Sequence, residues 1–112
     1  MISASTAMPW PPPPDMESLK ELFATADIEG LIADDAPMDE YDPEASHFFE
    51  AINGYKTSDL VVAQILPVLE RIWTKSFVLK HAQIMARRPT LLALAQQIER
   101  FFGPEATPQV RS

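Results

Sequence analysis

The chain has two histidines, and one of them has carboxylates at a spacing that could serve metal chemistry. His47 follows Glu44 by three residues and precedes Glu50 by three, which on a helix makes the three side chains neighbours. Helical di-metal proteins use such a Glu-x-x-His motif, but they need it from two helices together with further carboxylates. The sequence contains no second copy. We therefore expect a surface His47 paired with Glu50, and no metal site.

Further carboxylates crowd the segment DDAPMDEYDPE, residues 34–44, which we call the acidic segment. An EF-hand calcium loop needs oxygen ligands at alternate positions, a glycine at its sixth position and a glutamate at its twelfth. Pro37 and Met38 interrupt that pattern and glycine is absent, so at most weak calcium or magnesium association is expected. A pair such as Asp39 and Asp42 could act as general acid and base, but nothing in the sequence specifies a substrate.

Other signatures of catalysis are missing. The chain has no cysteine and no Gly-x-Ser-x-Gly motif, and its glycines (Gly30, Gly54 and Gly103) lie too far apart to form a phosphate-binding loop. His81, next to Lys80, has no acidic neighbour that would make it a base. The sequence therefore predicts a protein that is not an enzyme and needs no cofactor. A metal-dependent hydrolase is the last of the alternatives.

The charge is unevenly divided along the chain. Residues 1–55 hold twelve acids and one base, whereas residues 56–112 hold four acids and eight bases, for a net charge of −7. This excess of acid argues against nucleic-acid binding, which needs a basic face. The apolar stretch of residues 60–69, which carries no charge, is half the roughly 20 residues that span a membrane. Since the N-terminus also lacks the basic and apolar regions of a secretory signal, we expect a cytoplasmic protein with no membrane contact.

The elements that position these side chains are helices. Apolar residues recur at helical spacing and no stretch alternates long enough for a strand, so the chain is predicted to be all-α, a compact bundle of four to five short helices. A flexible proline-rich leader (1–14) precedes the single helical domain (15–104), and a tail (105–112) follows it. The expected helices cover residues 16–26, 43–52, 59–75, 77–87 and 90–102.

Several polar residues and prolines set the expected ends of these helices. Asp15 and Asp42 are predicted N-caps, Thr57 or Ser58 caps the third helix, and Ser76 caps the fourth. Pro43 suits the first helical position after Asp42. Pro67 falls inside the third helix and predicts a kink there, whereas Arg88-Pro89 is expected to separate the last two helices.

Three stretches of the sequence resemble a known family. They are GLIADDAPMDEYDPEA (residues 30–45), the helix sequence ILPVLERIWTKSF, and the ending AQQIERFFG. Together they are similar to the YugE-like family of small bacterial proteins of unknown function, over roughly residues 22–103. The resemblance implies a small all-helical fold with no assigned activity, catalytic residue or cofactor.

The acidic segment exceeds what helix capping uses, so a protein-interaction module without catalysis is the expected function. The expected partner is another protein, for which a basic surface would be complementary, or a second copy of the chain. It would contact the acidic segment or the wide apolar helix 59–73. A homodimer is an expectation of its own, because a helix apolar around so much of its circumference would need covering. The alternative is an immunity or antitoxin protein that neutralises a basic toxin enzyme. The candidate partner-binding residues are Asp34, Asp35, Asp39, Glu40, Tyr41 and Asp42.

Two interpretations of the acidic segment are open at this point. It is either a solvated loop that Pro37 keeps extended, or a loop that Tyr41 anchors against the helices. In the second case Asp39, Glu40 and Asp42 would face the basic residues Lys80, Arg87 and Arg88, within one chain or across a dimer.

Overall fold

A computed structural model describes residues 13–106 of the chain. The described part contains the α-helices α1 (Met16–Ala26), α2 (Asp42–Ala51), α3 (Val62–Ser76) and α4 (His81–Phe102), with a single 3₁₀ turn, η2 (Thr57–Asp59), before α3. It contains no strand, so the predicted all-α fold is confirmed. The expected leader falls mostly on residues 1–12 and the expected tail mostly on 107–112, which lie outside the described residues.

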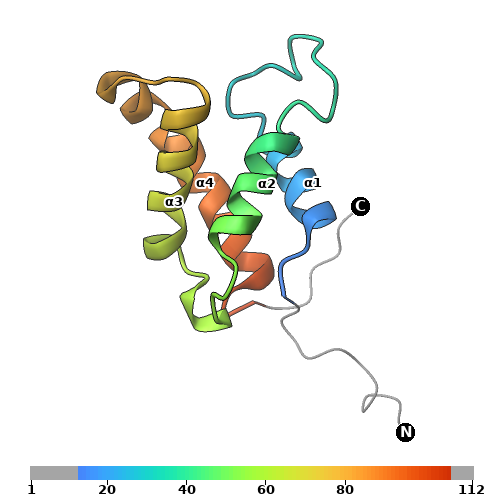
Figure 1. Ribbon diagram of the computed structural model, residues 1–112, viewed down its shortest axis with the longest axis vertical. Coiled ribbons are helices and arrows are strands. Elements are labelled where there is room, and N and C mark those ends of the chain that lie inside the picture. The colour runs from blue at the N-terminus through green and yellow to red at the C-terminus, as the bar shows by residue number, and fades with distance from the viewer. Residues whose placement is uncertain (1–12, 107–112) are drawn as a thin grey trace, which may run out of the picture.

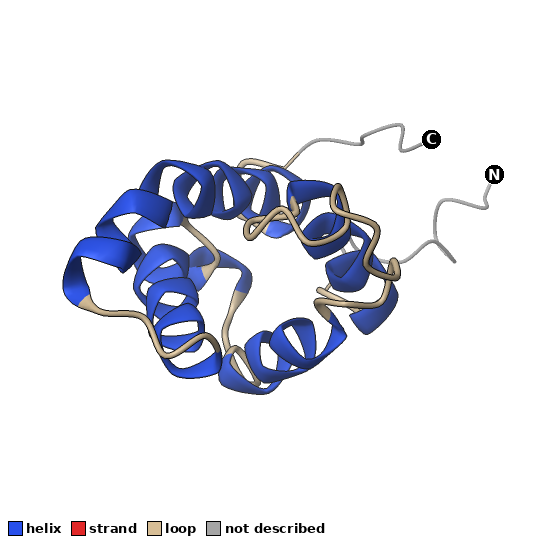
Figure 2. Cartoon of the chain, turned by 90° about the horizontal axis from the view of Figure 1, so that it is seen from above, coloured by secondary structure: helices blue, strands red, loops and turns tan. Residues whose placement is uncertain are grey.

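The four helices form an up-down-up-down bundle (Figure 1). Each helix packs against its neighbours in the chain, α1 on α2, α2 on α3 and α3 on α4, and α4 closes the ring against α1. Seen from above, the helices surround the space that their side chains fill (Figure 2). The connections 27–41 and 77–80 lie together at one end of the bundle, which we call the upper end. It is therefore this end that carries most of the acidic segment.

The core consists of the apolar faces predicted from the helical spacing. Trp73 of α3 is fully buried at the centre of the core. The centroid of its ring system lies 5.8 Å from the ring centroid of Phe23 and 5.7 Å from that of Phe77. Phe23 in turn lies 5.8 Å from Phe48 of α2, so one aromatic cluster joins α1, α2 and α3. Tilted ring pairs at such distances add to the free energy gained from burying their area.

The apolar side of α3 is covered within the chain. Ile65, Val68, Leu69, Ile72 and Trp73 are all buried, and no large apolar residue of α3 is among the exposed ones. The expectation that helix 59–73 presents an uncovered apolar surface to a partner or a second copy was therefore wrong. The other three helices bury it, because α2 and α4 flank α3 and the Phe23 ring of α1 packs against Trp73.

The predicted break at Arg88-Pro89 is also wrong, because α4 is one helix of 22 residues with Pro89 inside it. Proline in a helix interior removes one hydrogen bond and crowds the preceding turn, at a cost of about 3 kcal/mol. The contacts of α4 offset this, since Leu91, Leu94, Ala95, Ile98 and Phe102 are buried on one face beyond the proline. Pro67 lies inside α3, as expected.

The helix ends follow the sequence in some places only. Asp15 caps α1, its carboxylate accepting from the Ser18 N–H at 3.0 Å, as predicted. The expected caps Thr57 or Ser58 and Ser76 are wrong: α3 starts at Val62, whose N–H donates to Glu99 of α4 at 2.9 Å. At α4, the Gln83 side chain instead accepts from the Lys80 N–H at 2.8 Å. A cap supplied by a distant helix leaves no local pattern in the sequence.

Candidate functional site

Tyr41 holds the connection between α1 and α2 in place. Its side chain is 1% exposed, and its hydroxyl donates to the Asp27 carboxylate at 2.7 Å. The same oxygen accepts from the N–H groups of Glu29 at 3.0 Å and Leu31 at 3.4 Å. Burial, with the Asp27 hydrogen bond second, raises the pKa of Tyr41 to about 12. Of the second interpretation, the anchoring of the acidic segment by Tyr41 is therefore confirmed.

Asp27 is the second anchor of this connection. It follows α1 in the left-handed conformation (φ 43°), which aspartate tolerates better than most residues. Besides the Tyr41 hydroxyl, its carboxylate accepts from the N–H groups of Ile32 and Ala33 at 3.0 and 2.9 Å. The Tyr41 hydrogen bond, helped by these N–H groups, lowers the pKa of Asp27 below its usual value. The carboxylate thus accepts hydrogen bonds from backbone N–H groups of the connection, which are not paired within a helix or strand.

Glu29 ties the connection to the two long helices. Both of its carboxylate oxygens contact Arg87 of α4, with distances of 2.8 and 2.9 Å to the guanidinium nitrogens, and the indole N–H of Trp73 donates to it at 3.0 Å. The Glu29 side chain is 10% exposed and that of Arg87 28%. This two-point geometry is the strong form of an ion pair, and it raises the pKa of Arg87. The polypeptide between α1 and α2 is therefore fixed to α3 and α4.

The carboxylates that follow on this framework face solvent. Asp34, Asp35, Asp39 and Glu40 are exposed, and none of them makes an ion pair within residues 13–106. The acids are therefore solvated, as the first interpretation expected, but the segment is not kept extended by Pro37, because backbone hydrogen bonds close successive turns there. Examples are Ala36 N–H to Leu31 O at 2.9 Å and Glu40 N–H to Pro37 O at 3.1 Å. Like charges held on such turns repel one another without internal compensation.

Asp42 differs from these four residues. It is the first residue of α2 rather than its N-cap, which is Tyr41 without a side-chain cap bond, so the predicted capping role is wrong. Its carboxylate lies 3.7 Å from the ammonium of Lys20 on α1. Because Tyr41 is buried and Asp42 half-buried, the candidate contact residues reduce to the four exposed acids.

The expected intrachain contact between these acids and the basic residues 80, 87 and 88 is absent from the described part of the chain. Arg87 instead pairs with Glu29, and Arg88 pairs with Glu70 of α3 at 2.7 Å. Lys80 makes no ion pair there either. The arginines neutralise carboxylates that lie deeper in the fold, which helical spacing alone could not identify.

His47 is exposed on α2, and within residues 13–106 it makes no ion pair with Glu50, so the predicted surface pair is wrong. The neighbouring Glu44 is 7% exposed, and burial raises its pKa, opposed by its backbone N–H, by Ser76 and by His47.

No group of three or more His, Asp or Glu side chains that could hold a metal ion occurs among the described residues. Nor is any helix in that range long and apolar enough to cross a membrane.

Exposed apolar side chains gather near the same end as the acids. Four large apolar residues of the described chain are exposed: Met38 is 68% exposed, Val78 83% and Met85 41%, whereas Phe49 of α2 is 38% exposed. Met38 lies within the acidic segment, Val78 in the α3–α4 connection and Met85 in the first turns of α4. Val78 also has a φ of 51°, which is strained for a β-branched residue. The upper end thus combines exposed acids with exposed apolar groups.

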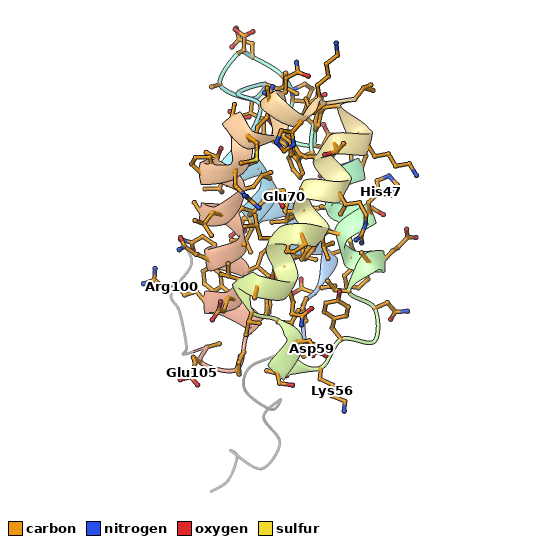
Figure 3. All side chains as sticks on the ribbon, turned by 90° about the vertical axis from the view of Figure 1, so that its left-hand side faces the viewer. His47, Lys56, Asp59, Glu70, Arg100 and Glu105 are labelled. Atoms are coloured by element: carbon orange, nitrogen blue, oxygen red, sulfur yellow. The ribbon has the colours of Figure 1, made fainter. Side chains whose placement is uncertain are left out.

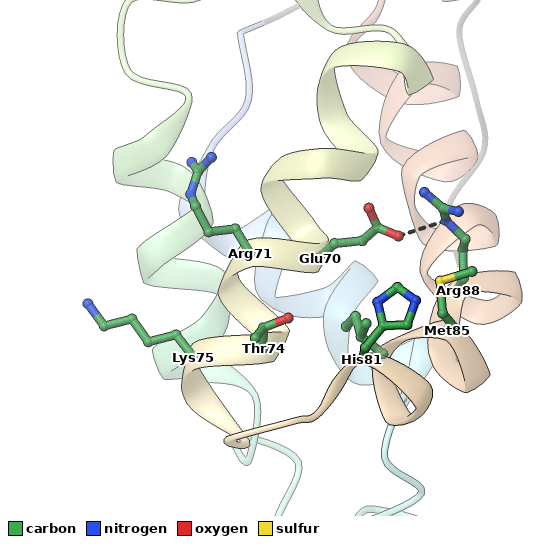
Figure 4. Close-up of a pocket in the computed structure, with 8 residues that line it drawn as sticks. Glu70, Arg71, Thr74, Lys75, His81, Met85 and Arg88 are labelled. Carbon is green, nitrogen blue, oxygen red and sulfur yellow. Dashed lines mark ion pairs between the residues drawn. The ribbon is translucent and has the colours of Figure 1, made fainter.

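Two grooves flank α3, one on its α4 side and one on its α2 side. Figure 3 views the bundle from the side on which α3 lies in front, between α4 and α2. One, of about 600 Å³, lies against α4 and includes Glu70, His81, Ile84, Met85 and Arg88. The other, of about 450 Å³, lies against α2 and includes His47, Ala51, Ile72 and Ser76. Arg71 and Lys75 line both grooves. In Figure 4 these two side chains point to the α2 side, whereas His81 and Arg88 stand on the α4 side.

Arg71 and Lys75 form what we call the cationic face. Both are exposed and neither makes an ion pair among residues 13–106. They are four residues apart on a helix, so their like charges are neighbours and repel each other. The cationic face and the exposed acids of the acidic segment therefore share one property, which is charge without an internal partner.

Sequence reasoning missed Asp27 and Glu29, the residues that hold the segment. Glu29 lies 44 residues from Trp73 and 58 from Arg87, so no local spacing connects them. The available signal was Asp27-Ile-Glu-Gly30 directly after a helix, because acids there can satisfy turn N–H groups.

No family model, no curated protein and no solved structure matches this chain.

Proposed function

We propose that this protein is a non-catalytic interaction module and that its acidic segment is the surface a protein partner contacts. The observation that carries the proposal is the contrast between a fixed backbone and unpaired charges. Tyr41, Asp27 and Glu29 hold the connection in one conformation, and the exposed acids nevertheless have no ion-pair partner in the described chain. A preorganised charged surface loses less entropy on binding than a mobile one.

The titratable groups with displaced pKa values support a structural rather than catalytic use. Asp27, Tyr41 and Arg87 belong to the contacts that hold the connection, and Glu44 is buried where α2 meets the end of α3. The pKa of Tyr41 is raised by burial and by its hydrogen bond to Asp27, and the same hydrogen bond lowers the pKa of Asp27. The pKa of Arg87 is raised by its hydrogen bonds to Glu29, and that of Glu44 by burial. Exposed Met38 adds an apolar contact among the acids, and interface cores favour such methionines.

Photo-crosslinking in cells tests the proposal. A photoreactive phenylalanine derivative replaces Met38, and the same derivative at exposed Gln64 of α3 is the matched control. We expect a defined polypeptide adduct from position 38 alone. It should disappear when Asp34, Asp35, Asp39 and Glu40 are changed to Asn, Asn, Asn and Gln. Identical adduct patterns from the two positions would contradict the proposal.

A further inference from the structure

The acidic segment and the cationic face belong to the same end of the molecule but do not meet within one chain. The segment spans the upper ends of α1 and α2, and Arg71 and Lys75 lie in the last turns of α3, which also rises to this end (Figure 1). No ion pair joins the two within residues 13–106. A contact between them therefore needs two molecules.

Their chemistry is complementary in two respects. The segment offers carboxylates of Asp39 and Glu40 beside the exposed Met38. The cationic face offers Arg71 and Lys75 beside the α3–α4 groove, whose wall includes Met85 at 41% exposure. Pairing removes the uncompensated repulsion on both sides at once, and it covers apolar surface with apolar surface.

We propose that the partner of the acidic segment is the cationic face of a second copy of this chain. A two-fold axis at the upper end would place the segment of each copy on the cationic face of the other, so that every contact occurs twice. Asp39 and Glu40 then face the partner's Arg71 and the partner's Lys75, while Met38 packs beside the partner's Met85. This inference rests on the proposed function, because it takes the acidic segment as the contact surface.

Charge reversal with complementation tests the dimer, using the full chain in sedimentation velocity and light scattering. The wild type should have twice the 12.5 kDa mass of one chain at low ionic strength and should dissociate in high salt. Asp39→Lys with Glu40→Lys, or Arg71→Glu with Lys75→Glu, should each weaken dimerisation by about tenfold or more, since like charges then meet. An equimolar mixture of the two variants should regain the dimer, because both contacts of the heterodimer pair opposite charges.

Lys56→Glu with Arg100→Glu is the matched control for the second variant. It makes the same change in net charge in the lower half of the bundle, where Figure 3 places both residues, and it should leave dimerisation unchanged. Circular dichroism confirms that each variant is folded. A wild type that is monomeric at low salt, or a mixture that stays monomeric, overturns the inference.

The photo-crosslinking at position 38 separates this failure from that of the proposed function. An adduct of twice the chain mass supports both. An adduct with a different polypeptide keeps the proposed function and overturns the self-association, and the absence of a specific adduct overturns both.

Discussion

The hydroxyl of Tyr41 donates a 2.7 Å hydrogen bond to the carboxylate of Asp27, which lies fourteen residues earlier in the chain. This contact closes the connection between α1 and α2 at its base, because Asp27 directly follows α1 and Tyr41 directly precedes α2. This hydrogen bond lowers the pKa of Asp27, and together with burial, which is the larger cause, it raises the pKa of Tyr41. The exposed acids are thus presented from a closed loop whose two ends are bonded to each other.

Removing the Tyr41 hydroxyl should destabilise the fold. In Tyr41→Phe the N–H groups of Glu29 and Leu31 lose an acceptor and Asp27 loses a donor, for a loss of about 1–3 kcal/mol in the free energy of unfolding. Urea denaturation measures it. Tyr55→Phe is the matched control, because the half-buried Tyr55 has no hydroxyl hydrogen bond among the described residues. Equal losses in the two variants would contradict the anchoring role.

The same hydroxyl should make the protein sensitive to alkali. The pKa of Tyr41 is about 12 in the fold against 10.0 ordinarily, so the unfolded chain loses this proton first as the pH rises. The stabilisation is fully present below pH 10 and is lost between pH 10 and about 12, by a total of about 2–3 kcal/mol. Unfolding free energies measured across this window should fall more steeply for wild type than for Tyr41→Phe. Parallel curves would show that Tyr41 is not the responsible group.

The two arginine pairs of α4 should differ in strength. Arg87→Met leaves the nearly buried Glu29 carboxylate with only the Trp73 indole, and we expect a loss of about 2–3 kcal/mol. Arg88→Met breaks the pair with Glu70, where Arg88 is 49% exposed, and it should cost about 0–1 kcal/mol. A double-mutant cycle with Glu29→Gln measures the coupling of the first pair. Similar losses for both arginines would mean that Glu29 is not held as the structure describes.

The sequence predicted those parts of the fold that depend on residues close together in the chain, and it failed where tertiary packing decides. Asp15 caps the helix that starts at the next residue, and the apolar spacing of residues 16–26 needs no other part of the chain, so α1 was predicted with its observed bounds. Pro89 shows the opposite case. Its local preference is to end a helix, but the buried residues beyond it favour continuation, and only the packed bundle decides between the two.

The candidate site was predictable in its composition and not in its contacts. The excess of acid in residues 34–44 is visible in the sequence, and an anchoring role for Tyr41 was one of the two interpretations that the sequence left open. The partners of Arg87 and Arg88 were not, because Glu29 and Glu70 come from elements that only the tertiary fold brings to α4.

Neutralising the exposed acids should stabilise the isolated chain. Asp39 and Glu40 have no ion-pair partner among the described residues, so Asp39→Asn with Glu40→Gln removes repulsion and should raise the free energy of unfolding by about 0.2–0.5 kcal/mol. The gain should shrink in high salt, where the Debye length falls to about 3 Å at 1 M. Protein dilute enough to be monomeric isolates this effect from association.

Asp42→Asn is the informative comparison for that variant. Its carboxylate lies 3.7 Å from Lys20 and in the first turn of α2, so its neutralisation should lower stability by about 0.5–1 kcal/mol, again less in high salt. The two variants therefore shift stability in opposite directions at low ionic strength, although they neutralise neighbouring acids. If Asp39→Asn with Glu40→Gln instead lowered stability there, those carboxylates would have an attractive contact inside the chain. Their charge would then serve the fold rather than a second molecule.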